Sequence, residues 1–246
     1  MNSYSKMIVA ALDDEVKTIK SALEIDRTFH LKPATLYQGT WLGNPLSVFV
    51  TGMGPKNMRE GLQKLQDFCL PTLVCHIGYA GSCSPLVGTG KIVIAETVKE
   101  KWSGEFWRPD TAQKEQAQKI CKRAELSFEI GNLLTVSEAV FDPMEKAALG
   151  AEENVLALDM ESSVVAQWAT EKQIPFCIAR AVLDPLEMNL PAFDSRSTNP
   201  QPGLGALVQL LTHHPQEALK IPQLQYCAAT ARKTLTEFAR EWVKKT

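Results

Sequence analysis

Two carboxylates flank a methionine in the stretch "LALDMESSVVAQWA", residues 156–169, where an apolar strand would pass into a helix. Asp159 and Glu161 could favour the start of that helix, because the helix dipole is positive at its N-terminus. Alternatively, one of them could accept hydrogen bonds from a ligand that carries several hydroxyl groups. The residues alone leave both interpretations open.

Further acidic side chains stand at the ends of two other predicted strands. Asp13, Asp14 and Glu15 follow the first strand, where acids also commonly cap a helix. The long apolar run in "ARAVLD" ends on Asp184, which Pro185 follows directly. A carboxyl group that is partly desolvated has a raised pKa and can act as a general acid. The alternative for Asp184 is a turn-forming Asp-Pro pair.

Paired glycines mark two more strand ends. Gly52 and Gly54 in "VTGMGPKN" precede a predicted helix, where exposed backbone N–H groups suit an anion or a ribose oxygen, although a plain tight turn would also use them. Gly78 and Gly81 in "HIGYAGSC" would let a ligand approach the backbone at the end of a buried strand. In open α/β sheets, ligands bind beyond the carboxyl ends of the strands.

The elements that must position these residues alternate along the chain. Near-continuous apolar strands predict a sheet covered on both faces. We therefore expect one α/β domain over residues 1–246, a three-layer helix–sheet–helix sandwich with a central mixed, mostly parallel sheet. The expected strands are 7–12, a hairpin within 36–54 with its tip at Gly43–Asn44, 72–81, 91–98, 133–140, 154–160 and 176–184. The expected helices are 14–23, 55–68, 111–123, 142–149, 161–172, 203–212 and 222–244.

Composition excludes several classes of protein. The chain has 246 residues, of which 45% are hydrophobic and 22% charged, and its net charge is −2. This balance is typical of a soluble globular protein and carries no electrostatic signature for nucleic acid. We expect no membrane span, no signal peptide and a cytoplasmic location with reduced cysteines. The four histidines show no metal-ligand spacing, so no metal is expected.

The order of these motifs resembles the nucleoside phosphorylase/nucleosidase superfamily, in particular its methylthioadenosine/S-adenosylhomocysteine nucleosidase-like branch. The resemblance covers roughly residues 7–188 and rests on "AALDDEV", "TGMG", "GYAGSCSPLVGTGKIVI", "LDMESSVVAQWA" and "IPFCIARAVLD". It implies cleavage of the N-ribosidic bond of a purine, adenine-type nucleoside. It also implies a homodimer or higher homo-oligomer, because family pockets are completed by a neighbouring subunit.

The resemblance also implies roles for particular residues. Asp184 matches the general acid to N7 of the base, and Glu15 matches the carboxylate that activates water. Glu161 would accept hydrogen bonds from the ribose hydroxyls, Met160 would pack on the sugar, and Asp159 would start the helix. The remaining residues that the resemblance implies at the substrate are Gly52, Gly54, Tyr79, Ala80, Gly81 and, against the base, Val140 or Phe141.

One departure bears on the nucleophile. The phosphate-using members carry an arginine two residues before the first glycine of the "GYAG" motif and a serine just after it; here these positions hold His76 and Tyr79. Histidine is a poor substitute for a guanidinium. Hydrolysis is therefore favoured, and no cofactor is expected, with phosphate as a possible co-substrate if the reaction is phosphorolysis.

The C-terminal third departs from the nucleosidases. "LDPLEMNLPAFD" and "HHPQEALKIPQLQYCAATARKTL" resemble the hopanoid-associated phosphorylases, thought to remove adenine from adenosylhopane, although they could equally be a surface loop and a docking helix. Trp102, Phe106 and Trp107 could line an apolar pocket for the 5′ substituent or meet a partner subunit. A catalytically silent nucleoside-binding protein is a further alternative. A dinucleotide-binding oxidoreductase is excluded, since the first strand lacks Gly-x-Gly-x-x-Gly.

Overall fold

The computed structural model describes residues 4–188 and 221–244. The described strands are β1 (Lys6–Ala10), β2 (Glu24–Leu31), β3 (Ala34–Trp41), β4 (Asn44–Val50), β5 (Leu73–Ser82), β6 (Ile92–Glu100), β7 (Phe106–Trp107), β8 (Phe128–Thr135), β9 (Ala157–Asp159) and β10 (Phe176–Asp184). The described helices are α1 (Lys17–Ala22), α2 (Pro55–Phe68), α3 (Thr111–Arg123), α4 (Pro143–Glu153), α5 (Ser162–Glu171) and α7 (Ile221–Lys244). The expected helix at 203–212 lies outside the described residues.

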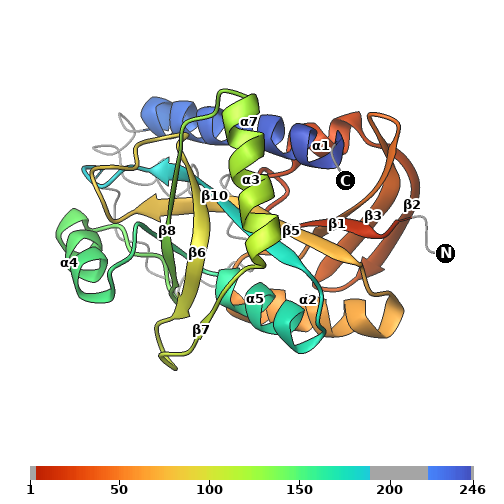
Figure 1. Cartoon of the computed structure of the whole chain (residues 1–246), viewed down its shortest axis with the longest axis horizontal. Helices are drawn as coiled ribbons and strands as arrows, with labels where there is room; N and C mark the ends of the chain where they lie inside the picture. The colour runs from red at the N-terminus through yellow and green to blue at the C-terminus, as the bar shows by residue number, and fades with distance from the viewer. Residues whose placement is uncertain (1–3, 189–220, 245–246) are drawn as a thin grey trace.

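The described strands form one mixed sheet between two layers of helices (Figure 1). Helices α1, α3 and α7 pack on one face, through residues such as Ile19, Ile120 and Phe238. Helices α2 and α5 pack on the other, through residues such as Leu62 and Val165. Successive residues of each strand point to opposite faces, so a strand that is covered on both sides must be apolar throughout. The predicted α/β helix–sheet–helix architecture is confirmed.

The sheet also closes on itself, which the sequence analysis did not predict. Strand β10 pairs with β5 on one side and with β6 on the other, and the path β6–β8–β9–β5 completes the ring. Strands β4, β1, β5 and β10 run parallel to one another, as expected for the centre of the sheet. The hairpins β2–β3–β4 and the pairs β10–β6 and β5–β9 are antiparallel, whereas β6–β8 and β8–β9 are parallel, so the sheet is mixed.

Most predicted boundaries agree with the structure, and the exceptions have local causes. The β3–β4 hairpin turns at Leu42 and Gly43, so its tip lies one residue earlier than predicted. Both residues have positive φ, as in the two-residue hairpin turn whose twist matches that of the strands. Strand β2 was missed because most of its residues are exposed and it lacks an apolar pattern. The expected strand 133–140 is instead Phe128–Thr135, whose first five residues are only partly buried or exposed.

Because β1, β4, β5 and β10 are parallel, their carboxyl ends meet at one edge of the sheet. Glu15, Glu161 and Asp184 lie in the segments at this edge and are buried, along with Arg180 within β10. Buried charged side chains are rare unless they are paired. This edge is therefore the candidate site for chemistry. None of the described helices is long and apolar enough to cross a membrane.

Candidate active site

A fully buried guanidinium lies at the centre of the polar cluster. Arg180 on β10 is in register with Gly78 of β5. Its Nη2 lies 2.6 Å from Asp159 Oδ2 and 3.8 Å from Glu161 Oε2, and its Nε donates to Ser162 Oγ at 3.0 Å. Burying a cation is costly unless it is paired in this way. Arg180 was not among the predicted site residues, although a charged residue inside the apolar strand "ARAVLD" was the available signal.

His76 contacts the same guanidinium and is neutral. Its Nδ1 lies 3.0 Å from the carbonyl oxygen of Val9, which can only accept, so Nδ1 carries the proton. Its Nε2 therefore accepts from Arg180 Nη2. Burial, together with the positive charge of Arg180, holds the pKa of His76 well below its usual value. His76 thus adds no charge to the site.

Gly78 is required by the closeness of Arg180 and Glu15. A Cβ at this position would lie 1.9 Å from Arg180 Nη1 and 2.7 Å from Glu15 Oε1. We expect Gly78→Ala to lower the free energy of unfolding by at least ~1–3 kcal/mol, the usual cost of overpacking, because the guanidinium it displaces has buried partners. Urea denaturation measures this. Gly88→Ala is the matched control, since its Cβ would meet open space; equal stability of the two variants would contradict the expectation.

Glu15 turns back toward the sheet instead of capping a helix. Its Oε2 accepts from the backbone N–H groups of Ala11 and Leu12 at 3.0 and 2.8 Å, and its Oε1 accepts from that of Tyr79 at 2.8 Å. Burial raises the pKa of Glu15, against the lowering effects of Arg180 and of the three amides. Helix α1 begins only at Lys17, later than predicted.

The neighbouring Asp14 holds the loop that carries Glu15. It accepts from the Tyr79 hydroxyl at 2.7 Å and from Arg232 Nη1 of α7 at 2.6 Å. The Tyr79 side chain therefore points to Asp14, and it is the Tyr79 backbone N–H that reaches Glu15. Ala80 packs its side chain into the core.

The two carboxylates around Met160 have separate tasks. Asp159 accepts from the backbone N–H of Ser162 at 3.2 Å at the start of α5, as the helix interpretation predicted, and it also pairs with Arg180. Glu161 Oε1 accepts from the Gly54 backbone N–H at 2.7 Å, so the anion at this glycine turn is Glu161 itself. Burial raises the pKa of Glu161 to about 8, with Asp159 and Glu15 raising it further and Arg180 lowering it.

Asp184 ends β10 beside Gly81, where a Cβ would lie 3.1 Å from both carboxyl oxygens. Lys146 of α4, which is fully buried, donates to Asp184 Oδ2 at 2.9 Å. Burial raises the pKa of Asp184 to about 6, against the lowering effect of Lys146. Lys146 was not among the predicted site residues, because in "PMEKAALGAEE" it has the pattern of an ordinary surface lysine.

The remaining predicted residues lie around these carboxylates. Met160 and Val140 pack against the same apolar cluster, whereas Phe141 packs with Met188 and Leu224. Gly52 and Gly54 both have positive φ at the β4–α2 turn. Direct contact of these residues with a substrate stays a prediction. The 5′ side of the pocket also stays a prediction, because residues 189–220 lie outside the described part.

The aromatic loop lies elsewhere on the molecule. Trp102 and Phe106 are about half exposed, at 47% and 53%, and Trp107 packs against the core. The depression beside Phe106 is lined by Gln167 and Glu171, in the second half of α5, whereas Glu161 precedes the first turn of that helix. The loop therefore runs along α5: Ser103 donates to Glu100, which accepts from Ser163 in the first turn of the helix, while Phe106 lies beside its second half. Contact with a second copy stays a prediction.

The arrangement suits proton transfer next to a developing positive charge. Glu161 and Asp184 have pKa values on either side of neutral, so each can hold or release a proton under ordinary conditions. Glu15, Asp159 and Glu161 surround one guanidinium, so the site favours hydroxyl donors and cationic character over an incoming anion. Among the described residues, no group of side chains could hold a metal ion.

Known proteins resemble this chain in sequence and fold. A 5′-methylthioadenosine/S-adenosylhomocysteine nucleosidase of Bacillus cereus (strain B4264) is 26% identical over 195 residues, which span 72% of this chain and 84% of that protein. The nucleosidase of the same name from Colwellia psychrerythraea 34H, solved with adenine, superposes with a TM-score of 0.76 at 17% identity over 99% of this chain and 96% of that one. Futalosine hydrolase of Helicobacter pylori strain 26695 superposes with a TM-score of 0.72 at 15% identity, over 96% and 97%. These structures show a shared fold.

The family assignment comes from the sequence. The sequence profile described as Phosphorylase superfamily matches residues 6–198, a span that includes Glu15, Glu161, Arg180 and Asp184. That match extends over far more than half of the chain, and this protein therefore belongs to the Phosphorylase superfamily.

Proposed function

We propose that this protein hydrolyses the N-ribosidic bond of a purine nucleoside. The observation that carries the proposal is the convergence of Glu15 and Glu161 on Arg180, with Asp184 at the end of the same strand as Arg180. The nucleosidases that resemble the chain add support. Adenine is the proposed base, because the Colwellia structure contains it.

Asp184 supplies the proton for the leaving base. A purine departs poorly as an anion, so the C1′–N9 bond breaks more easily when N7 receives a proton as the bonding electron pair moves to the base. The carboxyl of Asp184 has a pKa of about 6, far closer to neutrality than that of an exposed aspartate, because it is buried. A general acid is most effective when its pKa lies near the working pH.

Glu161 holds the ribose by its hydroxyls, with Met160 against the sugar. Its Oε1 is oriented by the Gly54 backbone N–H and its Oε2 faces Arg180, so the carboxyl group is fixed before a ligand binds. The sugar gains oxocarbenium character as the bond breaks. Because the pKa of Glu161 is about 8, the group is largely protonated near neutral pH, and positive charge developing on the sugar favours its ionised form. That carboxylate stabilises the transition state more than it stabilises the neutral substrate.

Glu15 is the base that takes a proton from the attacking water. Three backbone amides fix its carboxyl, and Arg180 Nη1 lies against the same glycine, Gly78. This Nη1 is buried and makes no hydrogen bond within the described part of the chain. A water between Glu15 and Nη1 would satisfy both groups: it would donate to the carboxylate and accept from the guanidinium. Its oxygen then adds to C1′.

Phosphorolysis is the second candidate, and one observation favours it. The phosphate-using members carry an arginine where this chain has His76. Here the guanidinium of Arg180, on the adjacent strand β10, contacts His76. Asp159 already neutralises this charge at 2.6 Å, however, and Glu15 and Glu161 stand close by. A doubly charged phosphate would meet repulsion in such a site, whereas water would not. Electrostatics therefore supports hydrolysis.

A panel of purine nucleosides tests the proposal. We expect free base and free ribose from adenine ribosides, at a rate that added phosphate does not change. The 2′,3′-dideoxy analogues should react at least ~10-fold more slowly, the effect of losing about 1.4 kcal/mol of hydrogen bonding to Glu161. Ribose 1-phosphate as the product would support phosphorolysis, and binding without turnover would support a silent binding protein. Equal rates for ribosides and dideoxy analogues would contradict the role of Glu161.

A further inference from the structure

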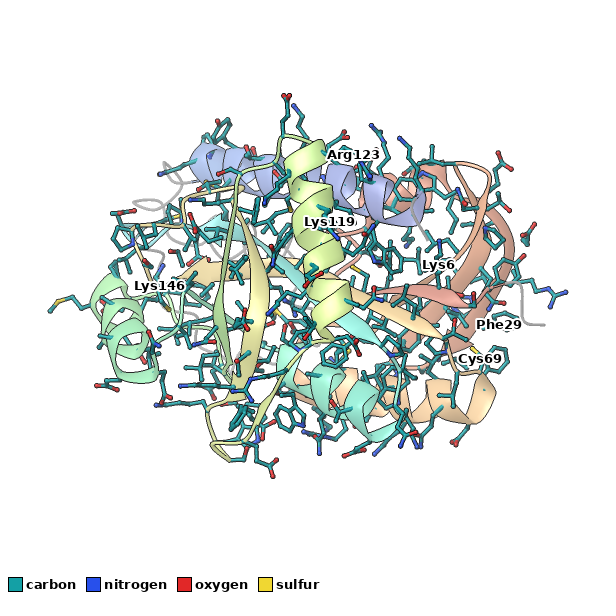
Figure 2. The ribbon with its side chains drawn as sticks, viewed as in Figure 1. Lys6, Phe29, Cys69, Lys119, Arg123 and Lys146 are labelled. Carbon is teal, nitrogen blue, oxygen red and sulfur yellow. The ribbon has the colours of Figure 1, made fainter. Side chains whose placement is uncertain are left out.

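Lys146 is the one side chain that α4 buries. The other residues of Pro143–Glu153 are exposed or partly exposed, while Lys146 has no exposed surface. Figure 2 labels Lys146 on α4, at the end of the molecule opposite β2. Its Nζ donates to Asp184 Oδ2 at 2.9 Å and to the carbonyl oxygen of Pro185 at 3.2 Å. The helix is thus anchored to the end of β10 through an ammonium group.

A lysine is a costly anchor. Fixing its long side chain loses rotamer entropy, and removing its charge from water carries a larger penalty before pairing offsets it. Leucine or methionine would hold α4 to the core at lower cost. The position is therefore better explained by what the ammonium does to Asp184 than by packing.

The charges that act on Asp184 are few. Among the described residues, Lys146 and Cys83 are the titratable groups whose charges are coupled to that carboxyl. Burial raises the pKa of the Cys83 thiol to about 12, so it is neutral at ordinary pH. Burial raises the pKa of Asp184, while the charge and hydrogen bond of Lys146 lower it. Lys146 is thus the single described cation opposing the effect of burial on Asp184.

We propose that Lys146 is a positioning residue for Asp184: it holds Oδ2, leaves the acidic proton to Oδ1, and stabilises the carboxylate that forms when this proton passes to the base. The proposal rests on the proposed function, since it assumes that Asp184 is the acid. When the proton moves from Oδ1 to N7, the negative charge appears 2.9 Å from an ammonium. Stabilisation that grows during the reaction accelerates it.

The test compares Lys146→Met, which removes the charge, with Lys146→Arg, which keeps it. Activity requires protonated Asp184, so kcat/KM falls as pH rises through its pKa. Without the ammonium that pKa rises, so in Lys146→Met the falling limb should move to higher pH by about 1–3 units. On the low-pH plateau kcat should fall on the order of 10²-fold. Lys146→Arg should restore the wild-type limb and most of the rate.

A second readout needs no activity. Carbon-13 NMR titration of the ligand-free protein follows the Asp184 carboxyl, assigned by its loss in Asp184→Asn. Its midpoint should rise in Lys146→Met and stay near wild type in Lys146→Arg. In the wild type, the chemical shifts of the Lys146 side chain should change with pH at the same midpoint as the Asp184 carboxyl. This measurement needs no variant, so it remains valid if a variant does not fold.

Lys114→Met is the matched control, because Lys114 pairs with Glu96 near the surface. This variant should leave the falling limb of the kcat/KM–pH profile unchanged. The inference would be overturned if the titration midpoint of Asp184 were unchanged in folded Lys146→Met. It would also be overturned if the Lys146 resonances of the wild type did not shift at the Asp184 midpoint. A midpoint that moves in a protein that cleaves no nucleoside would instead overturn the proposed function alone.

Discussion

Asp184→Asn is expected to lower kcat by at least ~10²–10⁴-fold, the usual contribution of a positioned general acid, with little change in KM. Asparagine keeps the size of the side chain and one acceptor oxygen, but it cannot deliver a proton to the departing base. An interaction made mainly in the transition state affects turnover more than apparent affinity. Steady-state kinetics with an adenine riboside measures both constants.

The same substitution leaves Lys146 buried without its counter-charge, which costs about 3–5 kcal/mol when one partner of a buried pair is removed. The double variant Asp184→Asn with Lys146→Met removes that charge, so it should recover stability without recovering turnover. Asp142→Asn is the control, because Asp142 caps α4 and asparagine caps equally well. Near-normal turnover in a folded Asp184→Asn protein would remove the general-acid assignment.

Glu15→Gln is expected to reduce hydrolysis by roughly 10²–10⁴-fold, since an amide cannot accept the proton of the attacking water. Phosphate arrives already charged and needs no base, so a phosphorolytic enzyme would tolerate the change. Release of free base, measured with and without phosphate, therefore reports the reaction type. If the rate depended on phosphate and did not change in Glu15→Gln, the reaction would be phosphorolysis.

Structure and chemistry must be separated in this variant. The Glu15 carboxyl accepts from three backbone amides, and the NH₂ of glutamine would face at least one of these donors. Urea denaturation measures the resulting loss of stability. Glu100→Gln is the matched control: Glu100 is also buried, but it accepts from the hydroxyls of Ser163 and Ser103 and is not among the acids that pair with Arg180 in the described part of the chain. That variant should keep its rate.

Residue type and order were enough to predict the architecture and to single out three carboxylates as candidate site residues. Apolar strands that alternate with helices can be covered only on both faces, so the three layers follow from the pattern. Glu15 and Asp184 stand at the carboxyl ends of β1 and β10, and these parallel strands bring both residues to one edge of the sheet. Glu161 follows β9, which is antiparallel to β5, so the parallel rule does not explain its place at the same edge. The interpretation of Asp159 as a helix-start residue also depended only on local sequence, and the structure confirms it.

Which residues far apart in the sequence contact one another was decided by the tertiary structure alone. Arg180 meets His76 and Glu15 only because β10 lies beside β5, and closure of the sheet around β10 could not be read from a local pattern. Lys146 looks like a surface residue until α4 docks on the end of β10. Burial and pairing set the charge state of each group, and both depend on contacts between distant segments. The sequence therefore identified the carboxylates as candidates, whereas the fold added Arg180 and Lys146 to them and decided which groups are charged and what each one contacts.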